Sequence, residues 1–280
     1  MLGALIIVFR EVIEAGLIVG IVMAVTQGVP GSRLVIAAGV AAGVVGAGLV
    51  AAFAGAIAEA LAGAGQEIFN ASILMIAVVM LIWHNVWMAS HGRELAADVK
   101  RVGEAVRTGS RSVLALGVVC AVAVMREGSE VALFMYGLAA SAGSTTSELL
   151  IGSLLGLAAG VAVTALTYVG LVTIPQRRLF AVTTALISFL AAGLAAQAAL
   201  FLQQAGVLTM LSQTAWDTSA ILSDTSLFGR VLHTLIGYSD EPSVLQVVVY
   251  LLTLAIIVVL TKAFGSRRTP AVKAHRAAAR

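Results

Sequence analysis

Seven long stretches of apolar residues constrain this chain more than any other feature. They cover about residues 4–25, 34–62, 68–90, 113–138, 148–172, 180–203 and 244–264. Each approaches or exceeds the roughly 20 apolar residues that a helix needs to cross a bilayer. Charged residues make up only 11% of the chain, whereas they are about a quarter of a soluble domain. The sequence therefore predicts an all-α, polytopic membrane protein with seven transmembrane helices.

No segment between these stretches is long enough to form a separate soluble domain. We expect a single transmembrane domain over residues 1–265 and a basic cytoplasmic tail over 266–280. The isoelectric point of about 9.4 does not indicate nucleic-acid binding, because no basic surface with a recognisable nucleic-acid fold stands behind it. The tail is instead typical of a solvated segment that contacts anionic membrane lipid.

The distribution of Lys and Arg predicts the orientation of the chain. With the N-terminus outside and seven spans, 14 of the 17 basic residues fall in cytoplasmic segments, as the positive-inside rule requires. They are Arg33, Arg93, Lys100, Arg101, Arg107, Arg111, Arg177, Arg178, Lys262, Arg267, Arg268, Lys273, Arg276 and Arg280. We therefore expect a multi-pass protein of a bacterial inner membrane, with its N-terminus outside and its C-terminus in the cytoplasm.

The predicted outer side carries the opposite charge. Its acidic residues are Glu59, Glu67, Glu148, Asp217, Asp224, Asp240 and Glu241, against Arg230 alone. An acidic mouth raises the local concentration of cations. Acidic residues contribute little to topology, so they could also lie there without a function. We favour cation attraction, because a second feature indicates the same chemistry.

That feature is an Arg-Glu-x-x-Glu motif that occurs twice inside apolar stretches. The first is Arg10-Glu11-Val12-Ile13-Glu14 and the second is Arg126-Glu127-Gly128-Ser129-Glu130. An ionised residue at the bilayer centre costs roughly 2.5–3.5 kcal/mol on insertion scales, so these residues must face protein, water or one another. Residues three apart on a helix share a face, so the two Glu of each motif converge. Each Arg lies four positions before the second Glu and offsets part of its charge.

Oxygen donors favour hard cations, whereas copper(I) prefers Met or Cys and zinc usually takes His or Cys. The four carboxylates therefore predict transport of a hard, multivalent cation, with Fe³⁺ the leading candidate. The alternatives are another cation such as Pb²⁺ or Mn²⁺, proton-coupled exchange, or ion pairs that only join two helices. A membrane di-iron carboxylate enzyme is less favoured, since such sites use Glu-x-x-His and both motifs are Glu-x-x-Glu. We expect no enzyme activity and no resident cofactor.

The motifs also indicate an internal repeat. The two Arg are 116 positions apart, and Gly39 and Gly43 precede Gly156 and Gly160 by 117. Three spans per copy would insert the second copy in the opposite direction, which predicts a 3+3 inverted repeat followed by a seventh helix. Inverted repeats place their substrate at the interface of the two copies.

With these residues, the sequence resembles the high-affinity iron permease family, which comprises fungal ferric permeases that work with a multicopper ferroxidase and bacterial relatives. The resemblance covers roughly residues 1–265. It rests on both motifs and on three further segments, namely Gln66-Glu67-Ile68-Phe69, Trp216-Asp217-Thr218-Ser219 through Gly229, and Gly237-Tyr238 with Pro242-Ser243 and Tyr250.

The resemblance implies seven helices and Fe³⁺ uptake, with a ferroxidase or a periplasmic iron-delivery protein as a possible partner. It implies metal ligation by Glu11, Glu14, Glu127, Glu130 and the outer Glu67, supported by Arg10, Arg126, Glu59 and Asp217. The chain departs from the family at Val12-Ile13, where Gly-Leu is more familiar, and at Asn70, where many members have Glu. The second change removes a carboxylate from the predicted outer mouth.

Two further features remain from the residues alone. His84 and Asn85 could be a ligand pair at the inner end of the third span, but polar groups there are more often satisfied by neighbouring helices. The segment 204–243 is long for a loop, and such loops are usually functional or disordered. We expect it to form a vestibule or to dock a partner.

Overall fold

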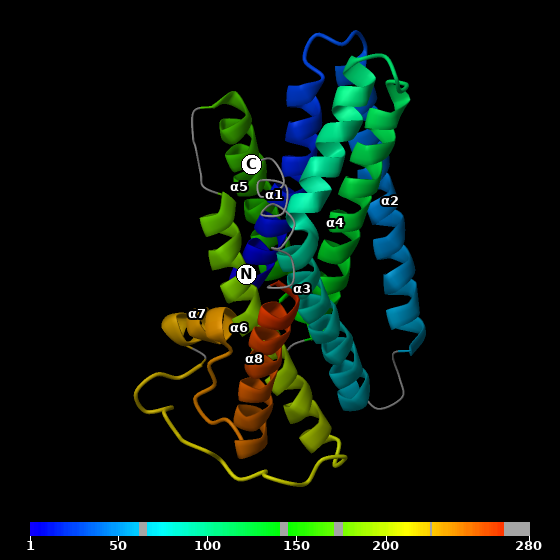
Figure 1. The fold of residues 1–280 in the computed structure, drawn as a ribbon. Helices are drawn as coiled ribbons and strands as arrows, with labels where there is room; N and C mark the ends of the chain where they lie inside the picture. The colour runs from blue at the N-terminus through cyan, green and yellow to red at the C-terminus, as the bar shows by residue number, and fades with distance from the viewer. Residues whose placement is uncertain (62–65, 141–144, 171–175, 225, 266–280) are drawn as a thin grey trace, which may run out of the picture.

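The computed structural model describes residues 1–61, 66–140, 145–170, 176–224 and 226–265. Over these residues the chain is helical, with one isolated bridge between Thr214 and Ser243 and no strand, so the all-α prediction is confirmed. Figure 1 shows the helices, which are α1 (Leu2–Val25), α2 (Ser32–Leu61), α3 (Gln66–Arg107), α4 (Leu114–Ala140), α5 (Thr146–Val169), α6 (Gln176–Gln204), α7 (Leu227–Ile236) and α8 (Val244–Gly265). The predicted tail, 266–280, lies outside the described residues.

Five of these helices are long and apolar enough to cross a membrane, namely α2, α3, α5, α6 and α8. The two helices that carry the motifs, α1 and α4, are as long, with 24 and 27 residues. Each has one Arg and two Glu inside its apolar stretch, whereas the apolar windows of the other five contain at most two Asp, Glu, Lys or Arg. Their charged residues must therefore be accommodated by the packing of the bundle.

The helix α3 is longer than its apolar stretch, with 42 residues. Its second half continues beyond the apolar segment and buries Val99 and Val106 against α1, α2 and α4. On its exposed side, Lys100 lies 3.8 Å from Glu104, four residues further on. This is the i, i+4 spacing that supports helices in solvent.

Two helix pairs approach each other very closely, α1 with α5 and α2 with α4. A Cβ added at Gly156 of α5 would lie 2.5 Å from the carbonyl oxygen of Leu5, and one added at Gly43 of α2 would lie 2.7 Å from that of Ala121. These separations leave no room for a side chain. Leu5 and Ala121 are 116 positions apart, the same offset as the two motif arginines.

The contacts correct the expected correspondence of the glycines. A Cβ at Gly39 would meet the carbonyl oxygen of Gly117, and a Cβ at Gly152 would meet the carbonyl oxygen of Met1. Met1 and Gly117 are again 116 positions apart. By their contacts Gly39 therefore corresponds to Gly152 and not to Gly156. Glycines with equivalent contacts in α2 and α5 are thus 113 positions apart, whereas the repeat predicted from the sequence uses 117.

The apolar interior is divided into two clusters with the motifs between them. One cluster includes Ile7 of α1, Leu81 of α3 and Phe134 of α4, together with residues of α6 and α8. The other includes Ile18 of α1 and Cys120 of α4, together with residues of α2 and α3. Along α1, α3 and α4 the intervals between the two clusters include residues 10–14, 84–85 and 126–130. Both sides of the charged region are thus closed by close-packed apolar side chains.

The expected vestibule or docking segment, 204–243, contains the short helix α7. Ser226 caps its N-terminus by accepting a hydrogen bond from the backbone N–H of Gly229 at 3.0 Å. Gly237 ends it in the left-handed conformation, with φ 70°. Gly237 also packs against Gly193 of α6, where a Cβ would lie 2.7 Å from the Gly193 Cα.

Candidate metal centre

The first motif forms a buried network on α1. Arg10 donates from Nε to Glu14 Oε1 at 2.7 Å and from Nη1 to Asn85 Oδ1 of α3 at 3.0 Å. Its Nη1 also lies 3.9 Å from Glu11 Oε1. Arg10 and Glu11 are each 1% exposed and Glu14 is 4% exposed. The Arg–Glu pairing at four residues' spacing agrees with the prediction, and α3 supplies a partner that the motif does not contain.

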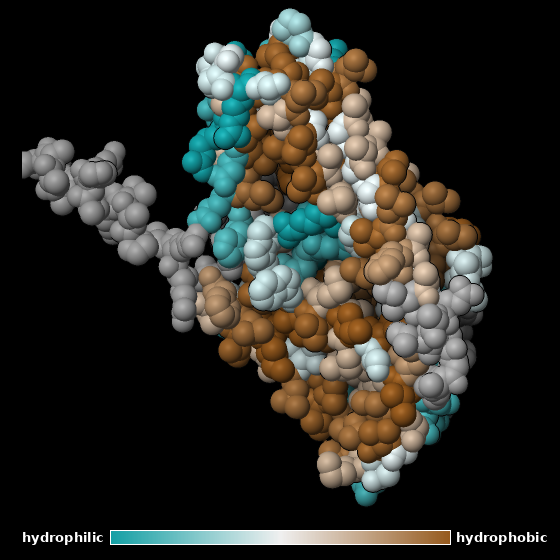
Figure 2. All heavy atoms as spheres, turned by 90° about the vertical axis from the view of Figure 1, so that its right-hand side faces the viewer, coloured by the Kyte–Doolittle hydropathy of each residue, from teal (hydrophilic) through white to brown (hydrophobic). Residues whose placement is uncertain are grey.

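The second motif repeats this pairing on α4 with weaker contacts. Arg126 donates from Nε to Glu130 Oε1 at 3.3 Å and lies 3.9 Å from Glu127 Oε1. Its guanidinium stacks 4.0 Å above the ring of Trp87. The Arg126 side chain is 33% exposed, whereas that of Arg10 is 1% exposed. Figure 2 shows a group of hydrophilic side chains at mid-height of one face with hydrophobic ones around it. The second motif therefore lies nearer the surface than the first.

The third helix places His84 between the two motifs. Its Nε2 lies 3.8 Å from Glu11 Oε2 and 3.5 Å from Glu14 Oε2, and its Nδ1 contacts Glu130 Oε2. The residue is 2% exposed. Sequence reasoning placed His84 at the inner end of its span and favoured a packing role. Its position one residue before Asn85 and three after Leu81, on the buried stripe of α3, was the signal that could have located it.

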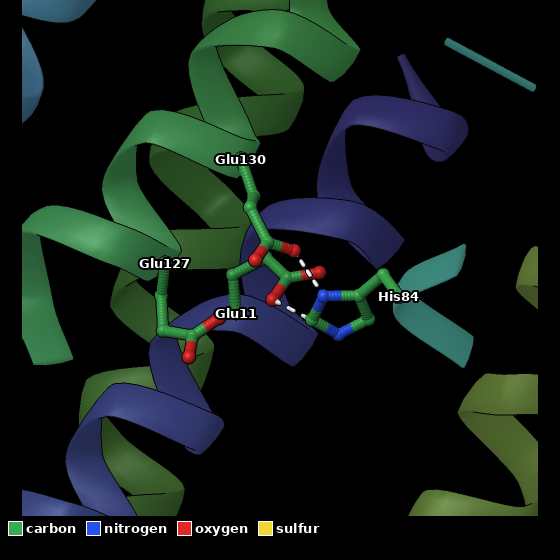
Figure 3. Close-up of side chains that lie close together, drawn as sticks. All are labelled: Glu11, His84, Glu127 and Glu130. Carbon is green, nitrogen blue, oxygen red and sulfur yellow. Dashed lines mark ion pairs between the residues drawn. The ribbon is translucent and has the colours of Figure 1, made fainter. Parts of the chain in front are cut away.

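Side chains from three helices thus converge at one point. Glu11, His84, Glu127 and Glu130 each offer a ligand atom, and these atoms all lie within 4.8 Å of one another. Figure 3 shows the three carboxylates and the imidazole directed toward a common centre. Glu14 stands beside this group, with one oxygen held by Arg10. The motifs of α1 and α4 therefore meet at one point in the bundle.

Several polar atoms of the cluster have no hydrogen-bond partner among the described residues. They are both carboxylate oxygens of Glu11, one oxygen each of Glu14, Glu127 and Glu130, both ring nitrogens of His84, and Nδ2 of Asn85. Buried polar atoms in folded proteins nearly always have a partner. If all are ionised, four carboxylates and two guanidiniums leave a net charge of −2. The arrangement can therefore accept a cation, which would satisfy both the charge and the unpaired oxygens.

The predicted outer residues lie apart from this cluster. Glu67 is exposed in the first turn of α3. Asp217 is exposed in the segment before α7, where its Oδ1 accepts hydrogen bonds from Ser219 Oγ at 2.6 Å and from the Ser219 backbone N–H at 3.0 Å. These bonds lower the pKa of the Asp217 carboxyl. The side chain of Glu59 lies outside the described residues.

A helical membrane bundle with a buried acidic centre defines a transporter-like protein, and comparison with known proteins identifies its family. The model of the iron permease FTR1 family matches residues 1–267, so the chain belongs to that family. It is a multi-pass membrane protein of a permease family.

Three curated relatives carry the name ferrous iron permease EfeU, and each is 35% identical over 190 residues, or 68% of this chain. The match covers 80% of the protein from Shigella flexneri. It covers 68% of the proteins from Escherichia coli O6:K15:H31 and O157:H7. No solved structure matches the chain.

Proposed function

We propose that this protein imports iron across the bacterial inner membrane through the four glutamates of its two motifs. Outer acidic residues attract the ion, and the carboxylates of α1 and α4 then bind it and pass it inward. The observation that carries the proposal is the convergence of Glu11, Glu127 and Glu130 from two helices, with buried oxygens that lack partners among the described residues. Membership of an iron permease family supports iron as the cargo.

The proposed topology has seven spans, with α1 and α4 crossing the membrane despite their charges. The N-terminus lies outside and the C-terminus inside, because this arrangement brings 14 of the 17 basic residues to the cytoplasmic side. The corresponding contacts of α1 with α5 and of α4 with α2 support a 3+3 inverted repeat. A centre at the interface of the two copies, as seen in transporters with inverted repeats, fits the position of the motifs between α1 and α4.

The oxidation state of the cargo has two candidates. Four carboxylates taken alone favour Fe³⁺, since oxygen donors suit hard ions. The curated relatives are named ferrous iron permeases, and His84 adds a nitrogen donor to the cluster, both of which favour Fe²⁺. A ferroxidase or a periplasmic iron-delivery protein is the proposed partner that supplies the ion. Mn²⁺ and Pb²⁺ are competitors in the same assay.

Uptake of radiolabelled iron into proteoliposomes tests the proposal. We expect the wild-type protein to transport iron and Glu11→Gln or Glu127→Gln to abolish uptake, because each removes one charged ligand without changing the side-chain volume. Glu104→Gln is the matched control, since Glu104 lies on the exposed part of α3 and pairs with Lys100. Unchanged uptake in both motif variants would refute the motif pathway. Presenting Fe³⁺ and Fe²⁺ separately, with Mn²⁺ and Pb²⁺ as competitors, distinguishes the cargo.

A further inference from the structure

We propose that His84, which lies outside both motifs, is a nitrogen ligand of the transported ion and sets the preference of the site for divalent transition metals over hard trivalent ions. This inference rests on the proposed function, in which the motif carboxylates hold the ion. It adds a third helix, α3, to a site that the motifs alone would build from α1 and α4.

The burial of His84 requires a partner for its ring. The residue is 2% exposed, and neither ring nitrogen has a hydrogen-bond partner of acceptable geometry among the described residues. Figure 3 shows the imidazole ring beside the carboxylates of Glu11 and Glu130, with one ring nitrogen directed at Glu130. A histidine that only filled space would direct a nitrogen to a backbone carbonyl or a hydroxyl group. The ring faces the place where, among the described residues, buried acidic oxygens also lack partners.

The spacing of the donor atoms fits a single ion. A metal that binds its ligands at about 2.1 Å holds neighbouring donors about 3.0 Å apart and opposite donors about 4.2 Å apart in an octahedron. One ligand atom from each of Glu11, His84, Glu127 and Glu130 lies within 4.8 Å of all the others. This upper limit is close to the separation of opposite donors around one ion, so all four residues are near enough to share a single ion.

The two nitrogens of His84 have different roles in this arrangement. A metal-binding histidine usually donates its other N–H to a carboxylate, which fixes the orientation of the ring. Glu14 Oε2 lies 3.5 Å from Nε2, while Glu14 Oε1 is held by Arg10 at 2.7 Å. Glu14 Oε2 is the nearest carboxylate oxygen to Nε2, so in the proposed loaded site Nε2–H is directed to Glu14 and Nδ1 is the ligand. Glu14 becomes a positioning residue, held by Arg10, and the ion is bound by three carboxylates and one imidazole.

The imidazole changes which ions the site prefers. Imidazole suits iron, zinc, copper and nickel as divalent ions, whereas carboxylate and water suit magnesium, calcium and manganese. A site of oxygen atoms alone has its greatest advantage with a hard, highly charged ion such as Fe³⁺. Replacing one oxygen by nitrogen shifts the balance toward Fe²⁺ and discriminates against Mg²⁺ and Ca²⁺. His84 is in this way the residue of the site that separates transition metals from the abundant hard divalent ions.

The alternative is that His84 is an imidazolium that only forms ion pairs with Glu11, Glu14 and Glu130. In that case it would repel a cation, and an ion bound by the carboxylates would have oxygen neighbours alone. The two roles differ in the atoms around the metal, so a spectroscopic measurement separates them independently of transport activity.

The test is iron K-edge X-ray absorption of the full-length protein in lipid nanodiscs, loaded anaerobically with Fe²⁺. The chain contains four histidines. In a variant in which His91, His233 and His275 are all replaced by Gln, His84 is the only source of imidazole. We expect the outer-shell scattering of one imidazole per bound iron in this variant. Bound iron with oxygen scattering alone would overturn the proposal, and this test does not depend on the folding of a His84 variant.

Selectivity gives a second readout. We expect His84→Asp to weaken Fe²⁺ binding by at least about 10-fold, because loss of residues that only support metal ligands already costs about that much. Binding of Ga³⁺, a redox-inert trivalent probe, should be retained or strengthened. His91→Asp is the matched control, because His91 lies two turns further along α3 and stacks on Trp87 at 5.3 Å. Equal losses for both ions, or no loss for Fe²⁺, would contradict the role of His84. Iron binding lost in Glu127→Gln but unchanged in His84→Asp would leave the proposed function intact and refute this inference alone.

Discussion

Arg10 and Arg126 occupy the same position in the two motifs, and replacing each by Met separates their contributions to the stability of the protein. Arg10 is 1% exposed and forms hydrogen bonds of 2.7 Å to Glu14 and 3.0 Å to Asn85. Arg126 is 33% exposed, forms a 3.3 Å hydrogen bond to Glu130 and stacks on Trp87. Met keeps much of the side-chain volume and removes the charge in both cases. The two variants therefore differ mainly in how much buried charge loses its partner.

The loss of stability expected for each variant follows from how deeply the arginine is buried. Removing one partner of a buried ion pair costs about 3–5 kcal/mol, because an unpaired charge stays in the interior. This applies to Arg10→Met, which strands the carboxylate of Glu14. For Arg126→Met, solvent screening reduces the loss of the ion pair to about 0–1 kcal/mol, and loss of the stacking on Trp87 adds about 0.5–1 kcal/mol. At about 2–4 °C per kcal/mol for a chain of this size, we expect Arg10→Met to lower Tm by roughly 6–20 °C.

Thermal unfolding of the purified variants, followed by size-exclusion chromatography after heating, measures this difference. The double variant Arg10→Met, Glu14→Gln is the internal check, since it removes the stranded charge together with its partner. We expect it to recover a large part of the Tm lost in Arg10→Met. Equal losses in Arg10→Met and Arg126→Met, or no recovery in the double variant, would refute the assignment of Arg10 to a buried network.

Three other substitutions test separate parts of the structure. Gly156→Leu places a side chain against a backbone carbonyl of α1 and should cost about 1–3 kcal/mol of stability in the same unfolding assay. Gly48→Leu is the control, because a side chain at Gly48 meets open space and should be tolerated. Asn85→Leu removes the acceptor for the buried guanidinium of α1 and should cost about 1.5–3 kcal/mol; an unchanged Tm would contradict that hydrogen bond. Ser219→Ala removes one donor to Asp217 and should raise the pKa of that carboxyl toward its ordinary value in a carbon-13 NMR titration. Because the pKa of Asp217 is lowered in the folded protein, the stabilisation from this bond is present above the ordinary pKa of the carboxyl. It is lost as the pH falls through the pKa of the folded protein. A titration of Asp217 that does not shift in Ser219→Ala would show that Ser219 Oγ does not donate.

The long helices were predictable because the bilayer imposes a simple rule on length and composition. The ends of α1, α4 and α8 agree with the expected stretches to within a few residues. The second half of α3 was missed because it is polar on one side and extends beyond any apolar run. Its signal was a helical period in Leu95, Val99 and Val106, which the search for continuous apolar segments does not detect.

The helix α7 was also missed, although both of its ends carry ordinary helix signals. Ser226 precedes it and accepts from the backbone N–H of Gly229, and Gly237 follows it with positive φ. A Ser before and a Gly after an amphipathic segment of ten residues is the expected pattern of a short capped helix.

The candidate site was predictable in part. Helical spacing predicted that Glu11 and Glu14 share a face and that Arg10 reaches Glu14, and both hold in the structure. Spacing within one helix cannot show which residue of a different helix faces the motif. His84 therefore remained one of several polar residues in the third span, and only the packing of α3 against α1 and α4 selected it.

The most direct test of the central claim is to locate iron itself by anomalous scattering at the iron edge in crystals of the protein loaded anaerobically with Fe²⁺. We predict a peak between α1, α3 and α4, about 2.1 Å from carboxylate oxygens of Glu11, Glu127 and Glu130. An iron peak at the outer acidic residues, with none between the two motifs, would contradict the claim that the motifs form one metal centre.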